Sequence, residues 1–330
     1  MTRLTLGIAG CGGFGNVHIR RLKGFPECKI TALCDPDQKR LEETLSKNFP
    51  DTPPPATFSD MREMIEHAKP DAVVIATPHT LHYEQGVLAL KAGCHVLMEK
   101  PMVTNPKHAR DLAKLAEKSG KVFLVGYNTP FLSGFQYVRA VVESGELGSL
   151  QTVIGWMSQN WHRFTQGTWR QDPSLSGGGM LYDSGAHLFA GVVWVVGERP
   201  TQVTAFLENK DAPVDLSGAV ALKFSNDVLA TLTISGVCQA DGSQALFCFE
   251  KGRILVDWWG HNFTRVYCAG AEPKDISPAK DSTPDENFVK AILEGESPIT
   301  PARLGVILTD LMDAVYTSAR QGTTVAITHE

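Results

Sequence analysis

The sequence predicts an α/β protein in two parts: a doubly wound parallel sheet, then an α+β domain with a large, open, mostly antiparallel sheet. Three observations predict this fold class. In the first 126 residues short apolar runs alternate with amphipathic stretches, which is typical of βαβ units. A glycine-rich turn follows the first of these runs. Later the pattern changes to consecutive strand-like runs separated by tight-turn pairs, which predicts hairpins.

Five apolar runs in the first part predict buried parallel strands. They are LTLGIAG, KITALC, DAVVIAT, HVLME and KVFLVG. Parallel strands covered on both faces are nearly continuously apolar rather than alternating. The stretches between them predict helices around 17–23, 39–47, 81–91 and 106–118. We therefore expect a first domain over residues 1–126.

The second part, residues 127–330, predicts helices over 135–144 and 188–196, followed by strand-rich segments. These segments are TQVTAFLE, GAVALKFSNDVLATLTISG and ALFCFEKGRILVDWW, with turn pairs at 226–227 and 251–252. Two closing helices are expected over 284–294 and 301–320, with Gly322 placed to end the second.

Composition excludes several classes of protein. A net charge of −5 provides no basic field for nucleic acid or anionic membrane, so neither is an expected partner. No apolar run approaches the roughly 20 residues that span a bilayer. The first residues, MTRLTLGIAGCGGFG, are typical of a strand and turn rather than a signal peptide. The seven cysteines are scattered without metal-ligand spacing, which predicts no metal site, no disulfide framework and a cytoplasmic location.

The glycine-rich turn predicts a dinucleotide site. Gly10, Gly12 and Gly15 form GxGxxG between a predicted strand and a predicted helix, and a helix N-terminus binds phosphates through free amides. Asp35 closes the second strand about 20 residues after Gly15, where an acid contacts the ribose. This carboxylate repels a 2′-phosphate, so NAD is favoured over NADP. A purely structural turn with a solvated acid is the alternative.

A second motif, Glu99-Lys100-Pro101, ends a predicted buried strand. Ligands of open α/β sheets bind beyond the carboxyl ends of the strands. A lysine there can donate to a substrate hydroxyl and stabilise alkoxide character. The alternative is a solvated lysine at a strand end.

A third motif, SGGGMLYDSGAH, places Asp183 and His187 four residues apart, on one face of a helix. The glycines would let the backbone pass close beside a ligand. One interpretation is a general base, since histidine accepts a proton near neutral pH. A polar helix face is a second, and half of a metal site is a third, although two ligands are too few.

These motifs, in this order, resemble the Gfo/Idh/MocA family of sugar and cyclitol oxidoreductases. The matching pieces are GIAGCGGFG, Asp35, DAVVIATPHTLH, AGCHVLMEKPM and SGGGMLYDSGAH, which together span most of the chain. The resemblance implies an N-terminal Rossmann domain, a second domain whose open sheet makes oligomer contacts, and a nicotinamide pointing toward the domain cleft.

The resemblance also implies roles for single residues. Lys100 matches a substrate-binding lysine, and Asp183 and His187 match an acid and a base. Further residues implied at the cofactor are Gly13, Phe14, Thr77, Pro78, His82, Glu99 and Lys100, and Asn128 is implied at the substrate. The chain departs from the family pattern at Ala190, where an aspartate is common, and after Asn128, where an arginine is common.

The segment NWHRFTQGTWRQDPSLSGGG contributes further candidates for a sugar pocket: Trp161, His162, Trp169, Arg170 and Asp172. Of these we expect Trp169 and Arg170 to bind the substrate. In a sugar pocket an aromatic face meets C–H surfaces and polar groups bind hydroxyls. A partly exposed loop with core tryptophans is the alternative for this segment.

Together the motifs predict an NAD(P)-dependent oxidoreductase that moves a hydride between a secondary hydroxyl of a sugar, sugar derivative or cyclitol and the nicotinamide. We expect a homo-oligomer, dimer or tetramer. Two other functions remain open at this point. One is a lyase or glycoside-cleaving enzyme that oxidises its substrate only transiently. The other is a non-catalytic regulator that senses the dinucleotide.

Overall fold

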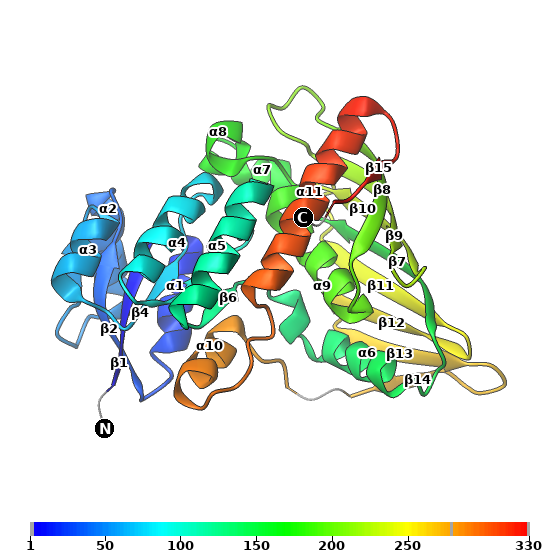
Figure 1. Ribbon diagram of the computed structural model, residues 1–330, viewed down its shortest axis with the longest axis horizontal. Coiled ribbons are helices and arrows are strands. Elements are labelled where there is room, and N and C mark those ends of the chain that lie inside the picture. Colours follow the sequence, from blue (N-terminus) through cyan, green and yellow to red (C-terminus); the bar gives the residue numbers. More distant parts are fainter. Residues whose placement is uncertain (1–2, 278–279, 329–330) are drawn as a thin grey trace. The chain divides into compact units, whose positions relative to one another are not determined.

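The computed structural model describes residues 3–277 and 280–328 (Figure 1). The chain forms two compact units. Unit 1 consists of Met1–Val103, Lys107–Gly126 and Thr283–Gly305, and unit 2 of Thr104–Pro106, Tyr127–Ser282 and Val306–Glu330.

Unit 1 is built on a six-stranded parallel sheet with the order β3-β2-β1-β4-β5-β6. The strands are β1 (Leu4–Ala9), β2 (Cys28–Cys34), β3 (Ala56–Phe58), β4 (Ala72–Ile75), β5 (His95–Met98) and β6 (Phe123–Val125). The strand order reverses between β1 and β4, and ligands of such sheets bind at this switch point.

Helices cover both faces of this sheet, which explains its continuously apolar strands. The helices are α1 (Gly13–Leu22), α2 (Gln38–Asn48), α3 (Met61–Ala68), α4 (His82–Lys91), α5 (Pro106–Ser119) and α10 (Pro284–Leu293). α1 packs against α2 and α10, and α3 packs against α4. Right-handed connections place these two groups on opposite faces.

The predicted second domain, 127–330, differs in extent from compact unit 2. Residues 283–305 lie in unit 1, because α10 packs against α1, β5 and β6 and covers part of that sheet. The periodicity of 284–294 predicted the helix but carried no information about which sheet it covers.

Unit 2 is built on a nine-stranded sheet with the order β14-β13-β12-β11-β7-β10-β9-β8-β15. The strands are β7 (Leu150–Ser158), β8 (Pro200–Glu208), β9 (Ser217–Phe224), β10 (Leu229–Ser235), β11 (Gly242–Phe249), β12 (Gly252–Trp259), β13 (Phe263–Cys268), β14 (Lys274–Ile276) and β15 (Val325–Ala326). Only β7 and β10 pair in parallel among the described strands of this sheet. The predicted fold class is confirmed.

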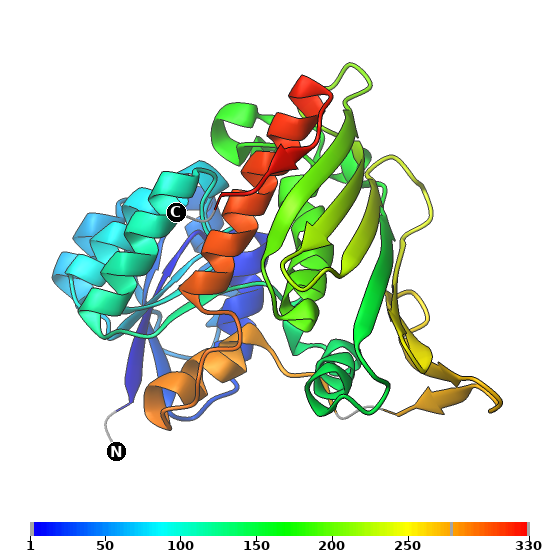
Figure 2. The same ribbon diagram turned by 45° about the vertical axis from the view of Figure 1, so that its right-hand side comes forward.

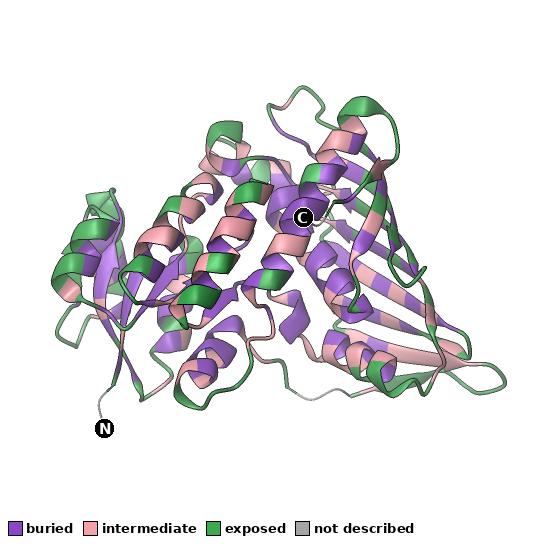
Figure 3. Cartoon of the chain, viewed as in Figure 1, coloured by how far each residue is buried: buried purple, intermediate pink, exposed green. Residues whose placement is uncertain are grey.

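The helices of unit 2 lie on one face of its sheet (Figures 1 and 2). They are α6 (Ser133–Ser144), α7 (Trp161–Thr165), α8 (Pro173–Ser176), α9 (Ala186–Val196) and most of α11 (Ala302–Gln321). In β7 and β10 buried and exposed residues alternate (Figure 3). No helix among the described residues covers the other face, on which Ile154, Trp156 and Leu229 are exposed.

One helical stretch, Pro173–Val196, is long and apolar enough to cross a membrane by length and composition alone. In the 18-residue apolar segment of this stretch, 83% is buried inside the protein. The helix α9 is buried along most of its length (Figure 3). This burial is that of a core helix. The sequence-based expectation had overlooked the stretch because its glycines and polar residues interrupt the apolar run.

Candidate functional site

The glycine-rich loop after β1 is shaped by close backbone packing. Gly10 has a φ of +92°, and a Cβ there would overlap the carbonyl group of Ala76 after β4. A Cβ at Gly15 would overlap the carbonyl oxygen of Gly10. Only glycine tolerates these positions, so the turn from β1 into α1 is fixed at the switch point of the sheet.

The middle of the same loop faces open space. Apart from the adjoining residues and the backbone of α1 itself, no described atom lies within 4 Å of a Cβ built on Gly12 or Gly13. Phe14 is 38% exposed. Gly12 caps α1 without a side-chain hydrogen bond, which leaves its first amide groups and the positive end of its dipole for an anion. The pyrophosphate of a dinucleotide fits this end of α1.

Asp35 follows β2 directly and contacts the same loop. Its carboxylate accepts hydrogen bonds from the main-chain N–H groups of Cys11, at 2.8 Å, and Asp37, at 3.0 Å. The residue is buried. A carboxylate beside the phosphate loop fits the predicted contact with the ribose of the dinucleotide.

Thr77, Pro78 and His82 follow β4. The ring of His82 is fully buried, with Nδ1 at 2.8 Å from the carbonyl oxygen of Pro101 and Nε2 at 3.0 Å from that of Thr77. Burial lowers its pKa. His82 therefore connects the loop after β4 to the loop after β5 and supports both, whereas Thr77 and Pro78 are half-buried.

Glu99 and Lys100 follow β5, and both residues are buried. The peptide bond between Lys100 and Pro101 is cis. The Glu99 carboxylate points toward α1, where its Oε1 lies 3.0 Å from Nε2 of His18. Its Oε2 accepts a hydrogen bond from the main-chain N–H of Lys100 at 3.2 Å. Glu99 thus has partners within unit 1, and its contact with the cofactor stays a prediction.

In unit 2 Asp183 lies in a π-helical turn, Leu181–Gly185, that leads into α9. The N–H of Gly185 donates to the carbonyl oxygen of Met180, five residues earlier, at 2.8 Å. The sequence predicted a regular α-helix here. Such wide turns occur frequently at functional sites. His187 is the second residue of α9 and is half-buried.

Two donors meet one carboxylate oxygen of Asp183. The indole N–H of Trp161 donates to Oδ2 at 2.7 Å, and Nε of Arg170 donates to the same oxygen at 3.0 Å. The guanidinium of Arg170 also lies over the ring of Trp169, 4.6 Å from its centroid. The structure therefore brings Asp183 together with three of the predicted substrate candidates, Trp161, Trp169 and Arg170.

The glycines before this turn are required by packing within the protein. A Cβ at Gly178 would overlap the hydroxyl of Tyr316, and one at Gly179 would overlap the main chain of Asp215. The expectation that they give clearance beside a ligand is wrong at these two positions, because protein atoms fill that space.

Asp215, which the sequence analysis missed, fixes the entrance to the turn. Its carboxylate accepts from the N–H groups of Gly179, at 2.7 Å, and Leu181, at 2.9 Å, and from the hydroxyl of Tyr316. Its carbonyl oxygen accepts from the N–H of Met180 at 2.9 Å. Burial raises its pKa. In the sequence, the one feature that could have pointed to Asp215 is the position of an acid within the apolar segment APVDLSG.

The remaining substrate candidate, Asn128, starts a short 3-10 turn, Thr129–Phe131, and is half-buried. The two departures from the family pattern belong to the core, since Ala190 and residues 129–131, which follow Asn128, are buried. Lys100 lies in unit 1, whereas Asp183, His187, Asn128, Trp169 and Arg170 lie in unit 2.

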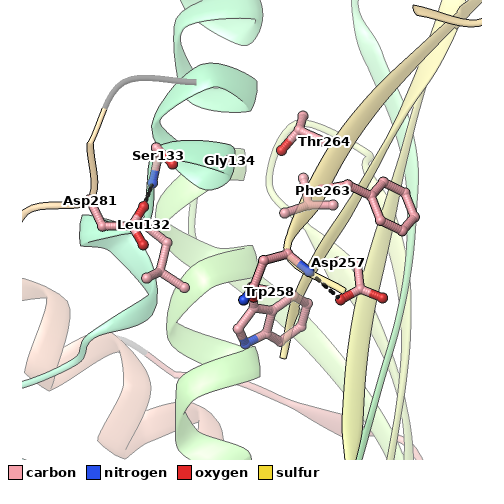
Figure 4. Close-up of a pocket in the computed structure, with 10 residues that line it drawn as sticks. Leu132, Ser133, Gly134, Asp257, Trp258, Phe263, Thr264 and Asp281 are labelled. Carbon is pink, nitrogen blue, oxygen red and sulfur yellow. Dashed lines mark hydrogen bonds between the residues drawn. The ribbon is translucent and has the colours of Figure 1, made fainter. Parts of the chain in front are cut away.

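A cavity of about 310 Å³ in unit 2 is lined by none of these residues (Figure 4). The two carboxylates that line this cavity accept hydrogen bonds from other groups of the protein. Asp281 accepts from the N–H of Ser133 at the start of α6, at 2.7 Å, and Asp257 accepts from the side chain of Gln244, at 2.9 Å. Within residues 3–277 and 280–328, no group of three or more His, Cys, Asp or Glu side chains is placed to hold a metal ion.

A parallel sheet whose switch point carries a glycine-rich loop and an open helix N-terminus defines a dinucleotide-binding protein. Residues 4–127 match the model of the oxidoreductase family with an NAD-binding Rossmann fold, and residues 135–255 match the GFO/IDH/MocA C-terminal domain. The chain belongs to the Gfo/Idh/MocA family.

Two curated relatives have sugar and cyclitol substrates in their names. D-glucoside 3-dehydrogenase of Escherichia coli is 29% identical over 200 residues, covering 59% of this chain and 54% of the relative. scyllo-Inositol 2-dehydrogenase (NADP(+)) of Bacillus subtilis is 29% identical over 204 residues, covering 61% and 54%. These alignments thus span about half the length of either relative.

Solved structures share the whole fold. A levoglucosan dehydrogenase in complex with NADH and L-sorbose superposes with a TM-score of 0.90 at 20% identity, covering 100% of both chains. This likeness shows the fold alone.

Proposed function

We propose that this protein transfers a hydride between a secondary hydroxyl of a sugar, sugar derivative or cyclitol and the nicotinamide of NAD. The single observation that carries the proposal is the cluster around Asp183, in which Arg170, Trp169 and Trp161 combine charge with aromatic surface. Such a combination suits a polyhydroxylated ring, whose C–H faces meet aromatic rings and whose hydroxyls meet polar groups. The names of the two curated relatives support the same substrate class.

We assign the following roles in this reaction to residues of the chain. Gly12, Gly13 and the first amides of α1 hold the pyrophosphate, and Asp35 holds the ribose. Lys100 donates a hydrogen bond to the reacting oxygen, and His187 takes the hydroxyl proton as the C–O bond becomes a carbonyl. Bound NAD supplies the hydride acceptor for the hydrogen that leaves carbon.

Asp183 has a holding role in this proposal. Its Oδ2 is engaged by Arg170 and Trp161, so the carboxylate fixes these side chains around the substrate.

A screen of polyols and sugars that follows NADH absorbance, with NADP in parallel, tests the function. Reduction of NAD in the presence of one sugar or cyclitol class is the expected result. Sugar analysis of the same mixtures separates the main alternative, because a transient oxidation yields product without accumulation of NADH. Tight NADH binding with no turnover of any sugar or polyol would contradict the proposal.

The preference for NAD over NADP is expected to depend on Asp35. Asp35→Ser removes the negative charge beside the ribose, and we expect it to weaken NADH binding about tenfold while NADPH binding changes little. Fluorescence titrations with NADH and NADPH measure the ratio. Asp37→Ser is the matched control, since Asp37 caps α2. Tighter binding of NADPH than of NADH by the unmodified protein would overturn the assignment.

We also propose a homo-oligomer, dimer or tetramer, formed through the outer face of the nine-stranded sheet. Ile154, Trp156 and Leu229 are 52%, 40% and 51% exposed there, and contiguous apolar patches mark contact surfaces. Ile154→Lys is expected to shift the protein toward monomers in light scattering. Leu293→Lys, at another exposed apolar residue on α10, is the control that leaves the mass unchanged. A monomeric unmodified protein would contradict this proposal.

A cytoplasmic location is part of the same proposal. All seven cysteines are free thiols, and burial raises the pKa of Cys11 and of Cys34 to about 12. Such thiols are inert, and chains with unpaired cysteines are typical of a reducing compartment. Cell fractionation with a cytoplasmic marker tests the location.

A further inference from the structure

A cluster of four ionisable side chains, His18, Arg21, Glu99 and Asp285, lies within unit 1, and the proposed reaction above gives none of them a role. His18, on α1, is 1% exposed and lies between two carboxylates. Its Nδ1 is 2.7 Å from Oδ1 of Asp285 on α10, and its Nε2 is 3.0 Å from Oε1 of Glu99. Arg21, one turn further along α1, reaches the other oxygen of Asp285 at 3.1 Å.

The geometry fits a charged imidazole. Ionised carboxylates only accept hydrogen bonds, so with Asp285 and Glu99 both ionised each ring nitrogen of His18 carries a proton. Burial alone would lower the pKa of His18, but the charges and hydrogen bonds of Asp285 and Glu99 raise it to about 10. The cluster then contains two positive and two negative groups, and each buried charge has a partner of opposite sign.

Glu99 connects this cluster to the residue that the proposed function places at the substrate. One carboxylate oxygen of Glu99 faces His18, and the other accepts the main-chain N–H of Lys100 at 3.2 Å. A Cβ at Gly126 would lie 2.8 Å from Oε1 of Glu99. A glycine at the end of β6 therefore provides the space that this carboxylate occupies.

We infer that His18 is a positioning residue: through Glu99 it fixes the main chain of Lys100 relative to α1, the helix that starts at the dinucleotide loop. The imidazolium holds Glu99 Oε1, so the other carboxylate oxygen stays directed at the N–H of Lys100. Asp285 holds the imidazolium from the opposite side. One buried ring thus connects the end of β5 to the helix that is expected to carry the cofactor phosphates.

This inference rests on the proposed function for the role of Lys100, but its first test does not. Hydrogen exchange at the Lys100 amide reports the bond to Glu99 without any substrate. In His18→Gln we expect exchange at Lys100 to accelerate about tenfold, because a neutral amide holds Glu99 less firmly than an imidazolium. Amides of α3 and β3 serve as internal references, and they are expected to exchange as before.

The second measurement is kinetic. His18→Gln is expected to lower kcat/KM for the sugar about tenfold while the Kd for NADH changes less than about twofold, since the phosphate loop is intact. His67→Gln, at an exposed histidine on α3, is the matched control with unchanged values. A purely structural role would lower thermal stability without accelerating exchange at Lys100.

Unchanged exchange at Lys100 in folded His18→Gln would overturn the inference, whatever the enzyme assay shows. If no sugar is oxidised by the unmodified protein, the proposed function fails while the exchange result still decides the role of His18. Should His18→Gln not fold, Asp285→Asn applies the same test, because it keeps an oxygen opposite Nδ1 but removes the charge. We then expect acceleration of about threefold, and no acceleration would again overturn the inference.

Discussion

His187→Ala is expected to lower kcat about a thousandfold while the Kd for NADH stays within about twofold of the unmodified value. The imidazole is the group proposed to take the hydroxyl proton, and a positioned base contributes a factor of this size. The residue belongs to unit 2 and the phosphate loop to unit 1, so we expect the fold of the loop and cofactor binding to persist. Stopped-flow or steady-state assays give kcat, and NADH fluorescence gives the Kd.

His261→Ala is the matched control for this variant. Its side chain is 84% exposed after β12 in the same unit, and its loss should leave turnover unchanged. Near-normal turnover in His187→Ala would exclude His187 as the base. A parallel loss of NADH binding would instead indicate that the variant disturbs the fold.

The second large effect concerns stability at alkaline pH. The folded-state pKa of His18, about 10, lies above its ordinary value of 6.5, so the folded protein keeps a proton that the unfolded chain releases between these limits. The stabilisation is complete below pH 6.5 and is lost as the pH rises toward 10. We expect the free energy of unfolding to fall by roughly 1 kcal/mol per pH unit over this window.

Urea unfolding of the unmodified protein and of His18→Gln at several pH values from neutral to alkaline measures this dependence. The difference between the two isolates His18, since Arg21, Glu99 and Asp285 are present in both. The two proteins should converge in stability as the pH rises. Parallel curves would show that the imidazole is not charged in the folded state. At acidic pH the lowered pKa of Asp285 acts in the opposite direction, with stability lost as the pH falls.

The fold of unit 1 followed from local patterns. Apolar runs and amphipathic stretches predicted its main strands and helices, because each signal depends on a few neighbouring residues. The packing of α10 against the sheet of unit 1 was not predictable from such local patterns. Its contact between Asp285 and His18 joins residues 267 positions apart, and the pattern of a helix does not specify the sheet that it covers.

The candidate site was predicted in part. Residue types and spacing identified the loop at Gly10–Gly15, Asp35, Lys100 and the pair of Asp183 and His187 as candidates. The residues that hold these candidates in place were not predictable. Asp215 binds the main chain at the entrance to the π-helical turn from 36 residues away in sequence. His18 has no feature in the sequence pattern that distinguishes it from other helix residues. The π-helical turn was also missed, because it depends on amides that Asp215 engages rather than on helix propensity.

The packing of α10 into unit 1 affects when this unit can complete its fold during synthesis. Both units are discontinuous in the chain, and each is completed only by residues beyond 282. During synthesis from the N-terminus, the sheet of unit 1 is finished at β6, long before Asp285 leaves the ribosome. Until then His18, Arg21 and Glu99 lack Asp285, the fourth member of their cluster. We therefore expect the nascent first unit to stay loosely packed around α1 until residues 283–305 emerge.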